Sequence, residues 1–231
     1  MKKRIVALAL VVLMLTVAVI GGTMAYFTDN DEATNVFTTG NVDIDLDENF
    51  DADNATLMPG IDITKEVDVK NLGTEDAFVR VHIAIPSMLD SGSEDEPQFA
   101  AYNNTLHFNF SKESYAAGKW SWNKTVDGAN YPGNGGAWNM YQQTIDGILY
   151  NVYVVTYKTA LATGDVADNA IYKVYLDTKV TNEQMSEIKR VLGANPQILV
   201  VAEGGQAAGF DDAYAALDKQ FGVPGSYNPF A

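Results

Sequence analysis

The chain has 231 residues, of which 15 are basic and 30 acidic, so its formal net charge is −15. This negative charge repels nucleic-acid phosphates and argues against a nucleic-acid partner. Because the chain contains no cysteine, a disulfide framework, a thiolate metal site and a cysteine nucleophile are all excluded. Its stability must therefore come from an ordinary hydrophobic core, and a chain with 47% hydrophobic residues can bury one in a single domain.

The first 25 residues have the pattern of an export signal. Three basic residues precede an apolar run from Ile5 to Ile20, which is followed by two glycines and by Thr23-Met24-Ala25, with small residues where a signal peptidase needs them. We therefore predict cleavage between Ala25 and Tyr26. Such a chain would be secreted, to the extracellular matrix or the cell surface, and would contact the membrane only through the uncleaved signal peptide.

An uncleaved membrane anchor is the alternative interpretation, because the apolar run is only slightly shorter than the roughly 20 residues that a spanning helix needs. The glycine pair and the abrupt change to Tyr26-Phe27-Thr28-Asp29 favour cleavage. We expect residues 26–231 to form a single domain.

Alternation of apolar and polar residues dominates the mature chain and indicates strands with one buried face. In the first such segment Val42, Ile44 and Leu46 share one face, and three aspartates share the other. A run that is apolar on both faces, 148–157, suits a central strand. The predicted strands are 42–47, 61–70, 79–85, 106–110, 148–157, 171–176 and 198–202.

Two short helices interrupt the strands. The first has a capping box at Thr181 and Gln184, and it ends before Gly193. The second begins near Asp211 and ends at Gly222. One face of each helix is apolar and is expected to contact the core: Met185, Ile188 and Leu192 in the first, and Tyr214, Leu217 and Phe221 in the second. These patterns together predict a mainly β protein, an antiparallel β-sandwich with two short peripheral helices.

At the N-terminus, the segment Gly21 to Asp29 is followed by the block Asn35 to Ile44. This specific pattern resembles the TasA and camelysin (CalY) family, whose members are secreted after cleavage by a dedicated signal peptidase, SipW. Weaker similarities follow at Met58-Pro59-Gly60, Val67 to Gly73, Ala77-Phe78-Val79-Arg80-Val81 and Ala202 to Phe210.

The resemblance implies a jelly-roll-like sandwich and a structural role, as a subunit of cell-surface or biofilm-matrix fibres that self-associates or co-assembles with related matrix proteins. Assembly in the family resembles donor-strand complementation, in which a segment released by signal cleavage pairs with an exposed sheet edge of the next subunit. The candidate donor strand here is 26–37, with apolar anchors at both ends: Tyr26, Phe27, Val36 and Phe37. Equally, this segment could be the first strand of its own domain.

The camelysin name also carries an association with metallopeptidase activity, which is the third functional hypothesis. A zincin helix needs two histidines one turn apart with a glutamate between them. This chain has only His82 and His107, and both alternate with apolar strand residues, so we interpret both as solvent-facing. No catalytic residue, metal ligand or cofactor site is predicted.

Acidic residues also invite a calcium hypothesis. Asp43, Asp45 and Asp47 match the first ligand positions of an EF-hand loop, but Glu48 replaces the required glycine and Asn54 the closing glutamate. The carboxylates of the loops are interpreted as a solvated surface; they include Asp51, Asp53, Asp90, Glu94, Asp95 and Glu96.

The runner-up hypothesis is an adhesin-like or glycan-binding module. Tryptophans cluster in the middle of the chain beside glycine and asparagine, and exposed rings on loops can stack on sugars or dock a partner. A role in the core is the commoner fate of such residues. The candidates for a binding surface are Trp120, Trp122 and Trp138.

Overall fold

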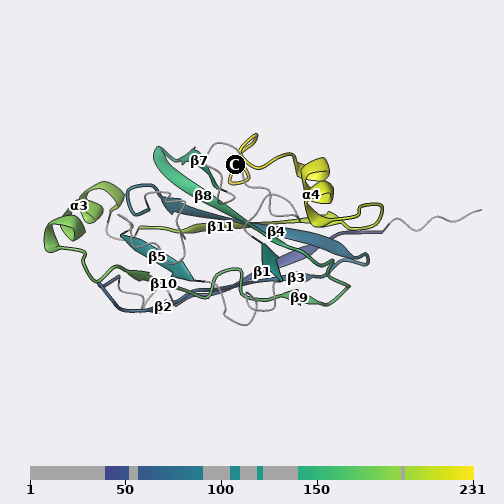
Figure 1. Cartoon of the computed structure of the whole chain (residues 1–231), viewed down its shortest axis with the longest axis horizontal. Coiled ribbons are helices and arrows are strands. Elements are labelled where there is room, and N and C mark those ends of the chain that lie inside the picture. The colour runs from purple at the N-terminus through teal and green to yellow at the C-terminus, as the bar shows by residue number, and fades with distance from the viewer. Residues whose placement is uncertain (1–39, 52–56, 91–104, 110–118, 122–139, 194–195) are drawn as a thin grey trace, which may run out of the picture. The chain divides into compact units, whose positions relative to one another are not determined.

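The computed structural model describes residues 40–51, 57–90, 105–109, 119–121, 140–193 and 196–231 (Figure 1). Residues 40–231 form one compact unit. The predicted signal peptide, its cleavage site at Ala25 and Tyr26, and the donor anchors Phe27, Val36 and Phe37 all lie outside the described residues.

The described part of the chain is mainly β, and every ladder between its strands is antiparallel. One sheet has the order β1-β3-β9, a second β2-β10-β5, and the third β11-β4-β8-β6, with β7 also paired to β8. The strands are β1 (Ile44–Asn49), β2 (Ile63–Thr64), β3 (Glu66–Asn71), β4 (Ala77–Pro86), β5 (Leu106–Asn109), β6 (Trp120–Ser121), β7 (Met140–Ile145), β8 (Ile148–Tyr157), β9 (Val166–Ala167), β10 (Lys173–Leu176) and β11 (Leu199–Gln206).

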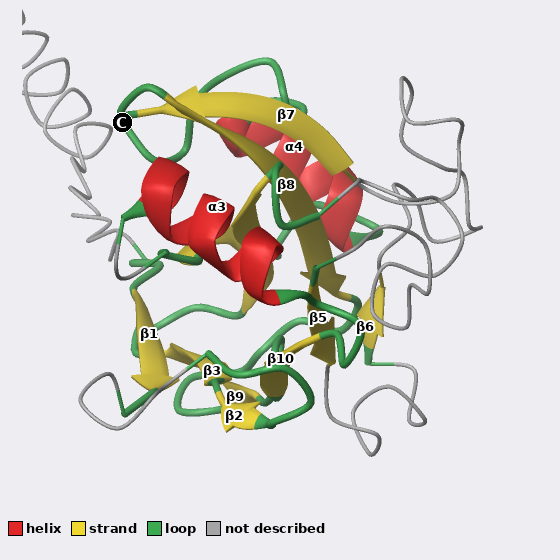
Figure 2. Cartoon of the chain, turned by 90° about the vertical axis from the view of Figure 1, so that its left-hand side faces the viewer, coloured by secondary structure: helices red, strands yellow, loops and turns green. Residues whose placement is uncertain are grey.

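The third sheet faces the two smaller ones, as in a sandwich (Figure 2). The main hydrophobic core lies between them. The inward side chains of β3, β4, β8 and β10 supply most of it, for example Val69, Ile83, Tyr153 and Val174, which are all buried. This arrangement confirms the antiparallel β-sandwich predicted from the alternation, with 148–157 as a central strand.

The outer face of the third sheet is covered as well. All ten residues of β4 are buried, although only alternate ones contact the main core. The other face of β4 lies under α4 (Ala213–Phe221) and the C-terminal segment that follows it, and there Phe78 packs with Ala213, Ala216 and Leu217. This second covering layer is why β4 has no solvent-facing side.

Both predicted helices are present. α3 (Asn182–Leu192) has the reciprocal capping box between Thr181 and Gln184, and Gly193 ends it with a positive φ of 83°. α4 begins after Asp212, whose side chain accepts a hydrogen bond from the Ala215 amide. The expected apolar stripe of α4 is only partly buried, because Phe221 in its last turn is 39% exposed.

Three strands were not predicted, namely the two-residue strands β6 and β9 and the longer β7. β7 forms a hairpin with β8 through Asp146 and Gly147, which both have positive φ (50° and 81°). An Asp-Gly pair between two strands is a strong hairpin signal because both turn positions require that left-handed backbone conformation. The Asp-Gly pair is therefore the sequence signal that could have located β7.

Candidate functional site

The structure corrects the interpretation of Trp120 as part of a binding surface. Trp120 is only 3% exposed, and its indole Nε1 donates a hydrogen bond to the Asp168 carbonyl oxygen at 2.7 Å. Its ring lies edge-on against Tyr157, with 5.0 Å between the centroids. Trp120 therefore belongs to the core rather than to a binding surface, while Trp122 and Trp138 lie outside the described residues.

The two histidines also differ from expectation. His82 was predicted to face solvent but is fully buried, because α4 and the C-terminal segment cover the outer face of β4. Aromatic rings surround it edge-on, from Tyr141, Tyr227 and Phe230. His107 lies in β5 opposite Tyr175 of β10.

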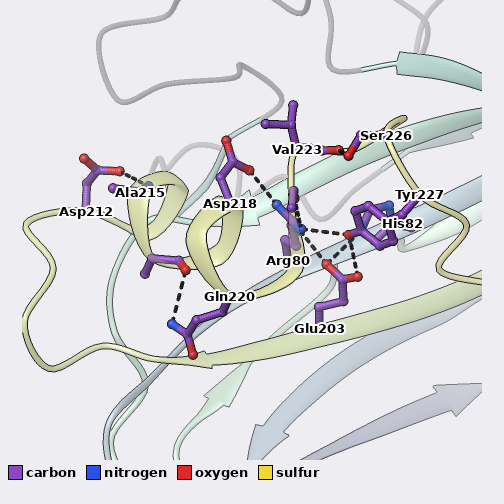
Figure 3. Close-up of polar contacts among 12 residues, drawn as sticks. Arg80, His82, Glu203, Asp212, Ala215, Asp218, Gln220, Val223, Ser226 and Tyr227 are labelled. Carbon is purple, nitrogen blue, oxygen red and sulfur yellow. Dashed lines mark hydrogen bonds and ion pairs between the residues drawn. The ribbon is translucent and has the colours of Figure 1, made fainter.

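His82 belongs to a buried polar cluster, which comprises Arg80, His82, Tyr141, Glu203, Asp218 and Tyr227. Figure 3 shows all of these residues except Tyr141. At its centre Arg80 of β4 and Glu203 of β11 are directly opposite each other in the strand register, and Arg80 Nε donates to Glu203 Oε2 at 2.6 Å. Both side chains are less than a tenth exposed. This pairing joins two of the segments that carried the family resemblance, since one contains Arg80 and the other Glu203.

The remaining donors of Arg80 hold the C-terminal part of the chain. Its Nη1 bonds to Asp218 of α4 at 2.8 Å, and its Nη2 donates to the Gly222 carbonyl at 2.9 Å and to the Tyr227 hydroxyl at 2.8 Å. Tyr227 in turn donates to Glu203 Oε1 at 2.5 Å. Every one of these donors has a partner, so the cluster fastens α4 and the segment behind it onto the sheet.

Protonation in the cluster follows from burial and from the Arg80 charge. Burial alone would raise the pKa of Glu203, but hydrogen bonding from His82, the Arg80 charge and the Tyr227 hydroxyl outweigh it and lower that pKa to about 2. Burial lowers the pKa of His82 below its usual value. Near pH 7 the cluster therefore holds an ionised Glu203, a charged Arg80 and a neutral His82 that donates through Nε2 to Glu203.

These groups are committed to one another, which limits their chemistry. Both ring nitrogens of His82 have partners, Tyr141 at 3.2 Å and Glu203 at 3.1 Å. Within the described ranges, no group of three or more His, Asp or Glu side chains is placed to hold a metal ion. The cluster therefore acts as a structural lock, by which we mean that it joins α4 and the C-terminal segment to the sheet.

A loop carboxylate that was expected to be solvated is buried too. Asp90 is 1% exposed, and its Oδ2 accepts hydrogen bonds from Tyr153 at 2.6 Å and from Asn151 at 3.2 Å. The acidic loop interpretation is therefore wrong at this position, because Asp90 follows β4 closely enough to bond to its neighbour β8.

A different feature is a pair of open strand edges. In β11, the backbone groups of Val200, Ala202 and Gly204 point away from β4, because these residues form the non-hydrogen-bonded pairs of that ladder. Within the described ranges, no hydrogen bond reaches this side of the three residues. β11 therefore offers backbone donors and acceptors to a further strand.

β1 has the matching open edge. Its residues Ile44, Leu46 and Glu48 direct their backbone groups away from β3, since the carbonyl of Asp43 already accepts from Leu72 and the pattern alternates. The two edges meet closely at one end, where a Cβ added to Gly204 would lie 2.5 Å from the Ile44 side chain.

Toward the other end Glu48 of β1 and Leu199 of β11 border a mainly apolar groove of about 1030 Å³, which α3 also lines. Its wall includes Leu57, Ile63, Leu106, Leu176, Ile188 and Ile198. An ion pair between Lys65 and Glu48 lies at its rim, and Lys65 also contacts the Phe50 ring. We call this space, together with the two open edges, the β1–β11 groove.

No helix in the described part of the chain is both long and apolar enough to cross a membrane.

Comparison with known proteins identifies a family for the N-terminal half of the chain. Residues 1–112 match the family described as camelysin metallo-endopeptidase. No curated protein matches the chain. The matched segment contains the N-terminal motifs and the block around Arg80 that suggested the resemblance, so residues 1–112 confirm the similarity to the camelysin family that the sequence predicted.

Proposed function

We propose that this chain is a secreted structural subunit of cell-surface or matrix fibres, and that it assembles by accepting an extended strand from a neighbouring copy in the β1–β11 groove. The observation that carries the proposal is the groove itself, in which two strands with open edges border one apolar space. The resemblance to the TasA and camelysin family, which implies such fibres, supports the same proposal.

Strand addition suits this groove for two physical reasons. An added strand would bond to the backbone groups of Val200, Ala202 and Gly204, which point away from β4. Alternate side chains of the same strand can enter the apolar space, where burial yields about 25 cal/mol for each Å² removed from water. Main-chain pairing provides affinity, and the apolar anchors set which segment fits.

The segment proposed as the donor is 26–37, at the new N-terminus that signal cleavage would create. Its apolar ends, Tyr26 and Phe27 on one side and Val36 and Phe37 on the other, can enter an apolar groove while its polar middle pairs along the edge. The partner would then be a second copy of this chain or a related matrix protein. Before cleavage, the membrane-held signal would keep the donor away from a neighbouring groove.

Val36→Asp and Phe37→Asp test the proposal, with Thr34→Asp as the matched control because it adds the same charge to the polar middle. We expect the first two variants to block fibres, because an unpaired buried carboxylate costs several kcal/mol, and the control to assemble. Electron microscopy reports fibres, and thermal melting of the monomer reports folding. Lowered melting temperatures with unchanged assembly would contradict the proposal and show that the segment belongs to its own domain.

The second candidate is a metallo-endopeptidase, which the family description favours. Against it, the sequence has only two histidines, and His82 is enclosed by the buried polar cluster. We therefore rank a structural role above an enzymatic one.

A further inference from the structure

One side chain closes the open edge of β11 at its C-terminal end. The carboxamide of Gln220, in the last turn of α4, accepts a hydrogen bond from the Gln206 amide at 2.9 Å and donates one to the Gln206 carbonyl at 3.1 Å. Figure 3 shows Gln220 reaching from α4 toward β11. This pair of bonds is the one that a residue of a neighbouring antiparallel strand would make.

The strand register shows that these bonds lie on the open edge. Gln206 is opposite Ala77, and Ala77 exchanges both of its own backbone bonds with Leu161 on its other side. Gln206 therefore directs its amide and carbonyl away from β4, in the same direction as Gly204 two residues earlier. The Gln220 carboxamide therefore occupies the position in which a residue of an added strand would pair with Gln206.

The position of Gln220 is fixed by its surroundings. Its Nε2 also donates to the Ala216 carbonyl within α4 at 3.1 Å. The side chain crosses Gly205, where an added Cβ would lie 2.9 Å from Nε2. Glycine at 205 thus allows the carboxamide to reach the edge, and the helix holds it there.

We propose that Gln220 is a stop for strand addition: an extended segment of a second copy pairs along β11 with Val200, Ala202 and Gly204 and ends before Gln206. This inference rests on the proposed function and specifies its register. Since side chains alternate along a strand, a stop at one residue decides which side chains of the incoming segment enter the apolar space and which face solvent.

The geometry also gives the stop a role in the monomer. An open edge can pair with any exposed strand, and proteins limit such edges by covering or blocking them. The Gln220 carboxamide shortens the open part of β11 to the stretch from Val200 to Gly204, which follows Leu199 in the lining of the apolar space. Addition is thereby confined to the position where apolar anchors of the incoming strand can be buried.

Hydrogen exchange of backbone amides tests the stop in the secreted chain, as monomer and as fibre. We compare Gln220→Ala and Gln220→Glu with Lys219→Ala, a neighbouring exposed position on α4. In the wild type, the Gln206 amide should exchange slowly in both states, and the Ala202 and Gly204 amides should slow only in fibres. In the Gln220→Ala monomer the Gln206 amide should exchange roughly tenfold faster or more, the equivalent of one lost hydrogen bond.

Fibres of Gln220→Ala give the decisive result. If Gln220 is the stop, its removal should let the incoming strand pair with Gln206 as well, and the Gln206 amide should become protected again on assembly. Gln220→Glu keeps an acceptor for the Gln206 amide, so it should retain that protection in the monomer. If the Gln206 amide still exchanges fast in Gln220→Ala fibres, or exchanges slowly in the Gln220→Ala monomer, the proposal that Gln220 stops strand addition is wrong.

Failure of the proposed function looks different. Wild-type fibres in which Ala202 and Gly204 exchange as fast as in the monomer would refute strand addition at β11 itself, and the stop with it. Because the chain has no cysteine, cysteine pairs introduced into β11 and the donor segment give an independent reading of register through disulfide formation. An unchanged register in Gln220→Ala also counts against the stop.

Discussion

Replacing Arg80 by methionine tests whether the buried polar cluster locks the C-terminal segment onto the sheet. The substitution keeps most of the side-chain volume but removes hydrogen bonds to Glu203, Asp218, Gly222 and Tyr227. It also leaves the carboxylate of Glu203, whose side chain is 8% exposed, without a positive partner. Breaking a buried ion pair in this way costs about 3–5 kcal/mol.

The expected consequence is a large loss of stability. For a domain of this size each kcal/mol changes the melting temperature by roughly 2–4 °C, so Arg80→Met should lower it by roughly 6–20 °C. Arg190→Met is the matched control, because Arg190 pairs with Glu187 at the surface, with side chains 70% and 52% exposed. Such a surface pair contributes at most about 1 kcal/mol.

A double-mutant cycle with Glu203→Gln separates the ion pair from the other contacts of Arg80. Glutamine keeps one of the two acceptor oxygens of Glu203 but carries no charge, so Arg80→Met should cost about 2 kcal/mol less in that background. Urea unfolding of the four proteins at pH 7 measures the cycle. A cost below about 1 kcal/mol for Arg80→Met, or the same cost in both backgrounds, would refute the lock as the source of stability.

Three further predictions address the pH dependence, the capping of α3 and the enzymatic alternative. Burial lowers the pKa of His82 below the usual 6.5, so on acidification His82 is protonated in the unfolded chain before it is protonated in the folded one. The free energy of unfolding should therefore fall as the pH drops below 6.5. His82→Gln should remove this pH dependence in urea titrations, and an unchanged profile would contradict the prediction. Glu203, with a pKa lowered from 4.5 to about 2, contributes stability above pH 4.5 that is lost between 4.5 and 2, and Glu203→Gln should flatten that second phase. Thr181→Ala should cost about 1 kcal/mol by removing the N-cap of α3, whereas Ser186→Ala on the exposed face of the same helix should be nearly neutral; equal effects would argue against the capping box. The purified chain should show no chelator-sensitive proteolysis, and activity that persists through purification and disappears on chelation would reverse the ranking of the two functions.

Local patterns were sufficient for most of the fold. Period-two alternation located β1, β3 and β4, and the capping box placed the start of α3 at Thr181, because these signals depend on neighbours in sequence. The run 148–157 was identified as a central strand from its apolar residues on both faces. β7 was missed although its Asp146-Gly147 turn is a local signal, and the two-residue strands β6 and β9 were missed as well.

The candidate site depended on contacts that no local pattern encodes. His82 and Arg80 alternate with apolar residues exactly as solvent-facing strand residues do, and only the packing of α4 and of Tyr227 over β4 makes that face buried. The Arg80–Glu203 pair joins residues more than a hundred positions apart, so the sequence shows two motifs but not their contact.

What the sequence determined by itself is therefore the alternation that makes strands, the caps that begin helices, and the family of the N-terminal half. The tertiary structure decided which faces are covered, which charges are paired and which strand edges stay open. The physical reason is that secondary structure follows from side-chain period and local hydrogen bonding, whereas burial depends on what the rest of the chain places on top. Gln220 illustrates this difference: in sequence it is an ordinary polar residue near the end of a helix, and only the fold places its carboxamide on the last backbone pair of β11.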